Sequence, residues 1–405
     1  MYTDFKKRNY GGSGASFSNK RFVRKPFSHA GSRPKVTFFN DVSCFINKAT
    51  VVEEAEHFVP EHRFVDFALD ERLKNNIVKK GYVDPTPIQD KTISHTLAGS
   101  DVVGIANTGT GKTAAFLIPL IHKVLQNKGE RVLIMVPTRE LAQQIGDELR
   151  GFTTGLPIYS ATCVGGTGIG PQMGALRRNP QFVIGTPGRL KDLLERRALV
   201  LTNFTTAVLD EADRMLDMGF IVDMRKILSL LPSTRNTLFF SATLSHEIEK
   251  LIGEFLRDPV RISVKTRDTA SSIDQDVVRV PRDGNKVDVL HNLLIQPEFN
   301  KVLIFGRTKH GVEKLSKTLV ERGFRSESIH GNKTQSGRQR ALDSFKRDNV
   351  NILVATDVAA RGLDIADVSH VINYELPATH DDYIHRIGRT GRAGKKGKAL
   401  TFIGA

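Results

Sequence analysis

Short apolar runs alternate along most of this chain with longer stretches that have the spacing of amphipathic helices. The runs are rich in β-branched residues and predict buried strands at 101–105, 131–136, 182–184, 206–209 and 237–240. Helical spacing is clearest at 114–126 and 139–149. Strands that alternate with helices in this way indicate a parallel sheet covered by helices on both faces, so the fold class is α/β.

A second alternation of the same kind follows the first. It predicts strands at 302–305, 326–329, 352–355, 370–374 and 399–403, with helices at 311–321, 336–346 and 380–387. Residues 260 to about 285 are polar and have few apolar anchors, which is typical of a linker or of a linker that runs into a strand. We therefore predict a tail at 1–55, a first domain at 56–260, a linker at 261–284 and a second domain at 285–405.

The N-terminal segment differs from the rest in both charge and periodicity. Residues 1–50 hold ten Lys or Arg and two acidic residues, Asp4 and Asp41. The resulting net charge of this segment is more than half of the chain's net charge of +15. Glycines, serines and spaced aromatic residues break up the segment, and no helical or strand period is present. We predict a disordered basic tail. Its charge and aromatic residues suit loose contact with single-stranded nucleic acid, and a solvating tail without a specific role is the alternative.

Two cysteines, Cys44 and Cys163, fit neither a metal-binding spacing nor a disulfide framework. The N-terminus has no apolar core of a signal peptide, and no apolar run approaches the roughly 20 residues that span a bilayer. The expected location is therefore cytoplasmic.

The clearest chemical signal is a phosphate-binding loop. The sequence Ala106-Asn107-Thr108-Gly109-Thr110-Gly111-Lys112-Thr113 follows a predicted strand and opens an amphipathic helix. Its glycines allow backbone N–H groups to turn toward phosphate oxygens at a helix N-terminus. Lys112 is the expected partner of the β- and γ-phosphates, and Thr113 the expected ligand of Mg²⁺.

A second part of the same site is expected on a neighbouring strand. The strand 206–209 delivers Asp210-Glu211-Ala212-Asp213 at its carboxyl end, where open parallel sheets hold their active sites. Asp210 is expected in the Mg²⁺ shell, and Glu211 is expected to orient a water for attack on the γ-phosphate. An acidic surface turn is the alternative that the phosphate loop makes improbable.

The second domain lacks such a loop, because the turn after its first strand reads Gly306-Arg307-Thr308-Lys309. It carries instead a run, His385–Arg392, with arginines set among glycines. These arginines are either a solvated basic face or fingers that stabilise transition-state charge in the other domain.

Taken together, these motifs and their order resemble the DEAD-box RNA helicases over residues 64–403. The resemblance implies two tandem RecA-like domains, ATP and Mg²⁺ as cofactors, and an RNA-stimulated ATPase. It implies catalytic roles for Lys112, Asp210, Glu211, Arg389 and Arg392, and Mg²⁺ ligation by Thr113 and Asp210. Phe64 is expected to stack on adenine, Gln89 to read its edge and Asp364 to contact the ribose. The other nucleotide-binding residues it implies are Thr108, Gly109, Thr110, Gly111, Lys112 and Thr113.

The resemblance also implies an RNA-binding set and a coupling element. The RNA-binding residues would be Pro137, Thr138, Arg139, Gly165, Gly166, Thr186, Pro187, Gly188, Arg189, Gln335, Arg338 and Thr356. Ser241 and Thr243 would couple the nucleotide state to RNA binding. The implied enzyme clamps single-stranded RNA through phosphates and 2′-hydroxyls, melts duplexes locally and resets on hydrolysis. A monomer with ribonucleoprotein or protein partners is expected. A DNA-directed helicase and a non-catalytic, ATP-gated RNA clamp are the alternatives.

Overall fold

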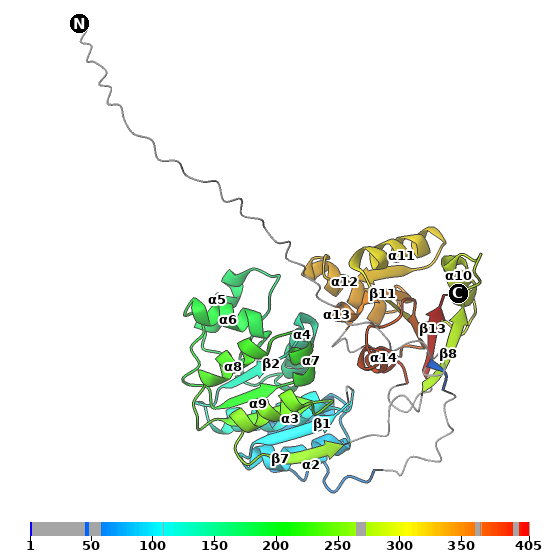
Figure 1. The fold of residues 1–405 in the computed structure, drawn as a ribbon. Coiled ribbons are helices and arrows are strands. Elements are labelled where there is room, and N and C mark those ends of the chain that lie inside the picture. The colour runs from blue at the N-terminus through cyan, green and yellow to red at the C-terminus, as the bar shows by residue number, and fades with distance from the viewer. Residues whose placement is uncertain are drawn as a thin grey trace, which may run out of the picture. The chain divides into compact units, whose positions relative to one another are not determined.

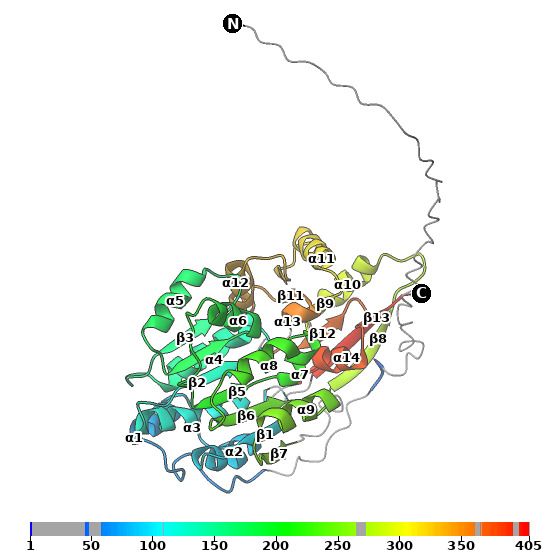
Figure 2. The same ribbon diagram turned by 60° about the vertical axis from the view of Figure 1, so that its left-hand side comes forward.

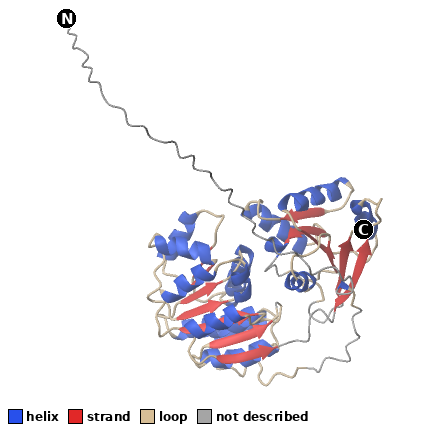
Figure 3. Ribbon diagram, in the orientation of Figure 1, coloured by secondary structure: helices blue, strands red, loops and turns tan. Residues whose placement is uncertain are grey.

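The computed structural model describes residues 1, 45–47, 58–107, 109–264, 273–360, 365, 367–391 and 397–404. Within these residues the chain forms two sheets, one of seven strands and one of six, and every pairing between named strands is parallel. Helices flank the strands of each sheet (Figures 1 and 3). The predicted pair of α/β domains with parallel sheets is thus confirmed.

The first sheet has the order β3-β4-β2-β5-β6-β1-β7. Its strands are β1 (Val102–Ala106), β2 (Val132–Met135), β3 (Ser160–Cys163), β4 (Phe182–Gly185), β5 (Thr206–Leu209), β6 (Asn236–Ser241) and β7 (Val260–Val264). The helices of this domain are α1 (Glu71–Lys79), α2 (Pro87–Leu97), α3 (Lys112–Gln126), α4 (Arg139–Phe152), α5 (Ile169–Arg177), α6 (Pro187–Glu195), α7 (Ala212–Asp217), α8 (Ile221–Ser229) and α9 (His246–Phe255).

The first sheet separates two hydrophobic cores. Successive residues of a strand point to opposite faces, so Val132 and Ile134 join one core while Leu133 and Met135 join the other. Helices α1 to α4 contribute to the first core, and α6, α8 and α9 contribute to the second. Burial on both faces explains why these strands read as continuous apolar runs.

The second sheet has the order β10-β11-β9-β12-β13-β8. Its strands are β8 (Ile273–Arg279), β9 (Val302–Gly306), β10 (Ser326–Ile329), β11 (Ile352–Thr356), β12 (His370–Asn373) and β13 (Gly397–Ile403). Its helices are α10 (Lys286–Leu294), α11 (Lys309–Glu321), α12 (Gln335–Lys346), α13 (Asp357–Ala360) and α14 (His380–Ile387). Figure 2 shows α14 lying against the sheet near β13 and β8.

Two features differ from the sequence-based boundaries. Strand β7 extends to Val264 and β8 starts at Ile273, so strands occupy much of the segment 261–284 that was expected to be a linker. The segment between them, 265–272, lies outside the described residues. In the tail, Asn47 forms an antiparallel bridge with Gln275, so residues 45–47 have a defined place. The remainder of the predicted disordered tail lies outside the described residues, apart from Met1.

None of the helices that the structure describes is both long and apolar enough to cross a lipid bilayer.

Candidate nucleotide and nucleic-acid site

The phosphate loop joins the carboxyl end of β1 to the first turn of α3. Gly109 and Gly111 have φ angles of +86° and +94°, a region that side chains disfavour. A Cβ at Gly111 would also lie 2.4 Å from Nε2 of Gln89, so a side chain there would displace the Gln89 amide as well as strain the backbone. Lys112 is buried, and its Nζ donates to the carbonyl of Ala106 at 2.7 Å. Thr110 closes the loop by donating its hydroxyl to Asn107 O at 2.8 Å, and Thr108 lies outside the described residues.

The predicted adenine reader, Gln89, is held against this loop. Its Nε2 donates to Gly111 O at 3.0 Å, and its Oε1 accepts from Thr86 N at 2.9 Å. Thr86 in turn donates its hydroxyl to Thr110 O at 2.8 Å. Gln89 therefore braces the phosphate loop in this structure, and contact with adenine stays a prediction.

The predicted stacking residue, Phe64, is buried with its ring edge-on to Tyr82 at 5.9 Å. Asp90, the neighbour of Gln89, holds the segment that leads to Phe64. Its Oδ2 accepts from Glu61 N at 2.8 Å, and its Oδ1 lies 2.8 Å from Nδ1 of His62. Nothing in the sequence pattern points to Asp90, whose contacts link both parts of the expected adenine site.

The acidic quartet Asp210–Asp213 follows β5, as predicted, but β5 is not the neighbour of β1. Strand β6 pairs with both of them and lies between them. The strand that separates the phosphate loop from the quartet therefore ends in Ser241, the first residue of the predicted coupling element.

Asp210 is buried beside Lys112 and Glu211. Burial raises the pKa of its carboxyl to about 6; the Lys112 charge opposes this shift and the Glu211 charge adds to it. Its Oδ1 accepts from Glu211 N at 2.9 Å. Within the described residues Oδ2 has no hydrogen-bond partner.

Glu211 is a non-glycine residue in the left-handed region, with a φ of +52°. Burial alone would raise the pKa of its carboxyl, but nearby positive charges, of which that of Arg214 is the largest and that of Lys112 the next, together outweigh burial and lower it. Arg214 Nη1 donates to Glu211 Oε2 at 3.1 Å, and both side chains are buried. Glu211 is thus kept as a carboxylate in an orientation that the strained backbone and Arg214 fix together. Sequence analysis did not identify Arg214.

Asp213 ties the quartet to the coupling element. Its Oδ2 accepts from Ala242 N at 3.1 Å, from Thr243 N at 3.2 Å and from the Thr243 hydroxyl at 3.3 Å. The Ser241 hydroxyl donates to Thr243 O at 2.8 Å. The turn after β6 is therefore built around a carboxylate from the turn after β5.

These residues fit a Mg²⁺–nucleoside triphosphate. Lys112 holds a single carbonyl oxygen and can exchange it for phosphate oxygens, while one oxygen of Asp210 is available to a hydrated cation. No cluster of three or more His, Cys, Asp or Glu that would hold a metal by itself occurs in the described part of the chain. A site that holds Mg²⁺ through one or two side chains and substrate phosphates is consistent with both observations.

The predicted RNA-binding residues of the first domain follow β2, β3 and β4. Thr138 caps α4 by accepting from Leu141 N at 3.2 Å. The Arg139 guanidinium lies against the glycine pair: a Cβ at Gly166 would fall 1.9 Å from its Nη1, and one at Gly165 would fall 3.4 Å from Nη2. The pair therefore gives Arg139 room that a side chain would fill. Thr186 directly follows β4 and is the N-cap residue of α6. Pro187 and Gly188 lie in the first turn of that helix.

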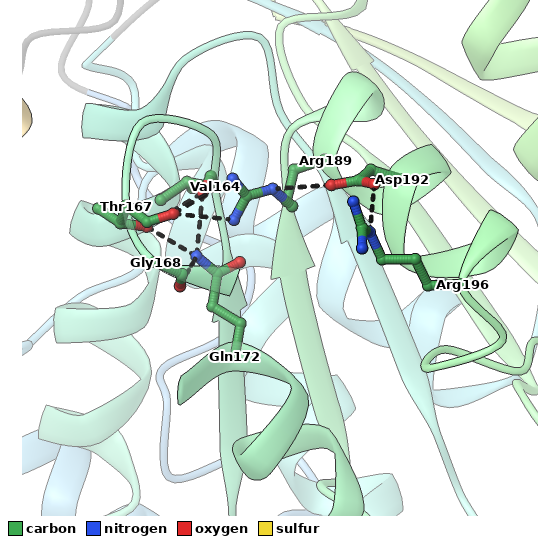
Figure 4. Close-up of polar contacts among 7 residues, drawn as sticks. All are labelled: Val164, Thr167, Gly168, Gln172, Arg189, Asp192 and Arg196. Atoms are coloured by element: carbon green, nitrogen blue, oxygen red, sulfur yellow. Dashed lines mark hydrogen bonds and ion pairs between the residues drawn. The ribbon is translucent and has the colours of Figure 1, made fainter. Parts of the chain in front are cut away.

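Arg189 is turned toward the protein (Figure 4). Its Nη1 and Nη2 donate to Thr167 O at 3.3 and 3.2 Å, and its Nε lies 3.7 Å from Asp192 Oδ2. The loop it holds follows the glycine pair. Arg189 was predicted as an RNA contact, and in this structure it braces the loop that carries two others.

Gln172 of α5 holds the same loop (Figure 4). Its Nε2 donates to Val164 O at 3.0 Å, to the Thr167 hydroxyl at 2.7 Å and to Gly168 O at 3.3 Å. Nothing in the sequence pattern pointed to Gln172, since only the folded loop brings these acceptors together.

In the second domain, Gln335 and Arg338 lie in the first turns of α12, which Thr334 caps. Gln335 Nε2 donates to Glu140 Oε1 at 3.1 Å, and Arg338 Nη2 lies 3.0 Å from Glu140 Oε2. Thr356 ends β11 and is buried.

The arginines of the run His385–Arg392 differ in their surroundings. Arg386 is buried and forms a bidentate pair with Asp357, at 2.5 and 2.8 Å, so it is structural. Arg389 is buried and lines a small cavity with Asp357, His385 and Arg386. Arg392 and Asp364 lie outside the described residues, so their predicted roles rest on the sequence.

Comparison with known families decides the relationship. The sequence model described as DEAD/DEAH box helicase matches residues 86–251, and the helicase conserved C-terminal domain matches residues 285–394. The chain belongs to the DEAD-box helicases. The resemblance predicted from the motifs is therefore confirmed.

Individual DEAD-box proteins are similar to this chain over most of its length. The ATP-dependent RNA helicase CshA of Listeria monocytogenes is 46% identical over 343 residues, which are 84% of this chain and 66% of that protein. The chain thus spans just under two thirds of this relative's length. Its fold is similar to that of S. cerevisiae Dbp5 bound to RNA and ADP BeF3, with 29% identity, a TM-score of 0.73 and coverage of 84% and 88%. DEAD-box helicase Mss116 bound to single-stranded RNA and UDP-BeF gives 33% identity, a TM-score of 0.77 and coverage of 84% and 74%. These likenesses identify both domains as RecA-like.

Proposed function

We propose that this chain is an ATP-dependent RNA helicase that clamps single-stranded RNA between its two domains, unwinds duplexes locally and resets by hydrolysis. The observation that carries the proposal is the bridge from Asp213 to Thr243. It joins the acidic quartet of the nucleotide site to the element expected to couple nucleotide state and RNA binding. The relatives support RNA as the substrate class, since they include an RNA helicase and proteins bound to RNA.

In this proposal Lys112 neutralises the β- and γ-phosphates, and Glu211 orients the attacking water. Glu211 suits this task because it is held as a carboxylate in a fixed position by Arg214. Mg²⁺, held through Thr113 and Asp210, would supply charge neutralisation on the phosphate oxygens. Arg389 and Arg392 would stabilise the charge that develops in the transition state.

ATP would be selected by Phe64 and Gln89, and its ribose would meet Asp364. Gln89 supports this role indirectly, because it already contacts the phosphate loop at Gly111. A base that engaged the Gln89 amide would draw on the same side chain that braces the loop. Adenine recognition and phosphate binding would therefore be linked through one residue.

The RNA backbone would run over the turns after β2, β3 and β4 and over α12. Arg139 and Arg338 would supply cationic contacts, and backbone N–H groups near Thr186 and the glycine pair would supply neutral ones. The other residues of the predicted set take part in the same surface: Pro137, Thr138, Pro187, Gly188, Gln335 and Thr356. Because such contacts reach phosphates and sugars, little sequence preference is expected.

The test is steady-state ATP hydrolysis with single-stranded RNA, with DNA of the same sequence, and without nucleic acid. The Glu211→Gln variant serves as the blank, since it keeps the site's shape and loses the carboxylate. Stimulation by RNA and not by DNA supports the proposal. Stimulation by DNA would favour the DNA-directed alternative, and ATP-dependent RNA retention without turnover would favour the non-catalytic clamp. We also propose that the protein is a cytoplasmic monomer that binds ribonucleoprotein or protein partners.

A further inference from the structure

One residue at the edge of the second sheet pairs with a segment that precedes the first domain. Strand β8 is the last strand in the sheet order, and beyond it Asn47 pairs with Gln275. Asn47 N donates to Gln275 O at 3.0 Å, and Gln275 N donates to Asn47 O at 2.7 Å. The segment is the short blue piece beside β8 in Figures 1 and 2. Asn47 thus forms a single antiparallel bridge with the edge strand, which is the kind of backbone contact that peptides use when they bind a sheet edge.

An aromatic anchor accompanies the backbone pairing. Phe45 is only 1% exposed and packs in a cluster with Ile273, Tyr383, Ile387 and Ala399. Its ring meets that of Tyr383 edge to face, with centroids 5.0 Å apart and an interplanar angle of 67°. The next residue, Ile46, is 46% exposed. The contacts of the segment therefore include one buried side chain and two backbone hydrogen bonds.

The surface under Phe45 belongs to the element that leads to the arginine run. Tyr383 and Ile387 lie on α14, and Arg389 follows two residues after that helix ends. The Tyr383 hydroxyl donates to Gln275 Oε1 at 2.8 Å, so the residue that pairs with Asn47 also holds α14. Ile273 is in close contact with Gly391, where an added Cβ would lie 3.0 Å from Ile273 Cγ1. The cluster thus borders the run on both sides of Arg389.

We infer that Phe45–Asn47 is an intramolecular strap that docks on β8 and α14 and positions the arginine run for hydrolysis. Phe45 is a positioning residue: it acts through Tyr383 and Ile387, and through Ile273 on Gly391. The inference rests on the proposed function for the part that concerns hydrolysis, whereas the docking itself does not.

The strap also acts as a second tether between the domains. The first domain resumes at Phe58, eleven residues after Asn47, and a chain of that length spans at most about 40 Å. A docked strap therefore adds a second covalent connection between the domains, beside the shorter connection through residues 265–272.

Hydrogen exchange on the full chain tests the docking without any need for activity. We expect slow exchange at the Gln275 amide, which donates to Asn47 O. This protection should be lost in Phe45→Ser, which removes the buried ring, and in Asn47→Pro, which removes the Asn47 N–H that donates to Gln275 O. Ile46→Ser is the matched control, since it changes an exposed neighbour, and it should leave exchange unchanged. Equal exchange in all four proteins would overturn the strap.

Steady-state kinetics test the positioning. Phe45→Ser should lower kcat at saturating RNA roughly tenfold with KM for ATP unchanged, which is less than the about 10²-fold that a 1 Å misplacement can cost. A peptide of residues 41–51 added to Phe45→Ser should restore part of the lost rate and the slow exchange at Gln275. If Phe45→Ser exchanges faster at Gln275 but keeps its kcat, the strap docks without positioning the arginine run, and that part of the inference is refuted. Absence of RNA-stimulated hydrolysis in the unaltered chain would instead count against the proposed function.

Discussion

The carboxylate of Asp213 and the hydroxyl of Thr243 lie 3.3 Å apart, and the same carboxylate oxygen also accepts from two backbone N–H groups of the turn after β6. Asp213 therefore shapes that turn, and a displacement at the acidic quartet reaches Ser241 and Thr243 through hydrogen bonds to a charged acceptor.

Thr243→Val should separate hydrolysis from unwinding. The substitution removes the hydroxyl donor and keeps the shape and both backbone donors, at a cost of about 1.5–3 kcal/mol for a hydrogen bond to a charged group. We expect duplex unwinding to fall by at least about tenfold while RNA-stimulated hydrolysis falls much less. Parallel unwinding and hydrolysis assays provide the measurement. Equal losses in the two assays would show that the turn serves the nucleotide site alone.

Arg214→Met should abolish hydrolysis although Arg214 is expected to contact no substrate. It leaves the Glu211 carboxylate buried without its partner, a change that costs about 3–5 kcal/mol in buried pairs. The Glu211 pKa should then rise, because Arg214 is the largest of the charges that lower it. Thermal unfolding should report the lost stability, and any residual activity should shift to higher pH. Arg225→Met, which breaks an exposed pair with Glu254, is the control and should change little.

Asp210→Asn should stabilise the nucleotide-free protein while destroying its activity. The carboxyl has a folded pKa of about 6 against 3.8, so the folded state holds more protons than the unfolded state between these values. Stability of the unaltered chain should therefore fall as pH rises through that window, by roughly 3 kcal/mol in total. The asparagine variant lacks this penalty, so its Tm advantage should be large at pH 7.5 and small at pH 4. A Tm advantage that is independent of pH would contradict the assignment.

The same carboxyl predicts how nucleotide binding responds to acid. A Mg²⁺-bound nucleotide needs Asp210 ionised, so below pH 6 each unit of acid should weaken Mg²⁺–ATP binding up to about tenfold. Titration of a fluorescent ATP analogue between pH 5 and 8 measures this. Binding without Mg²⁺ should lack the effect.

Arg189→Ala should weaken RNA binding by loosening a loop. Thr167 would lose both guanidinium donors, and hydrogen exchange across 165–168 should accelerate without RNA present. Arg196→Ala is the matched control, because Arg196 pairs with the same Asp192 at 2.7 Å but is exposed. If RNA affinity falls while exchange in the loop stays slow, Arg189 contacts RNA directly.

Elements with a strong apolar period could be predicted closely from the sequence. The strands at 206–209 and 326–329 and the helix at 380–387 have the predicted bounds. Strands β3, β7 and β8 escaped prediction. Strands β3 and β7 lie at the two edges of the first sheet and are only partly buried, while β8 is rich in Asp and Gln. Their pairing with β4, β1 and β13 comes from tertiary structure and not from local pattern.

The chemical residues divide in the same way. Lys112, Asp210 and Glu211 could be predicted as site residues because phosphate chemistry requires their types at that spacing. The order of strands could not, so the position of β6 between β1 and β5 was missed. Bracing residues such as Arg214, Gln172 and Asp90 carry no signature, since their partners are main-chain groups or side chains that only folding brings close.

The docked strap has a practical consequence for anyone who dissects this protein. A second domain produced alone from Ile273 onward would leave Gln275 at the edge of β8 without its backbone partner and would expose the apolar cluster that Phe45 covers. Bare edges of this kind pair readily with one another, so such a fragment should self-associate in concentrated solution. Fusion of residues 41–51 to the N-terminus of this fragment, through a flexible spacer, should restore a monomeric fragment.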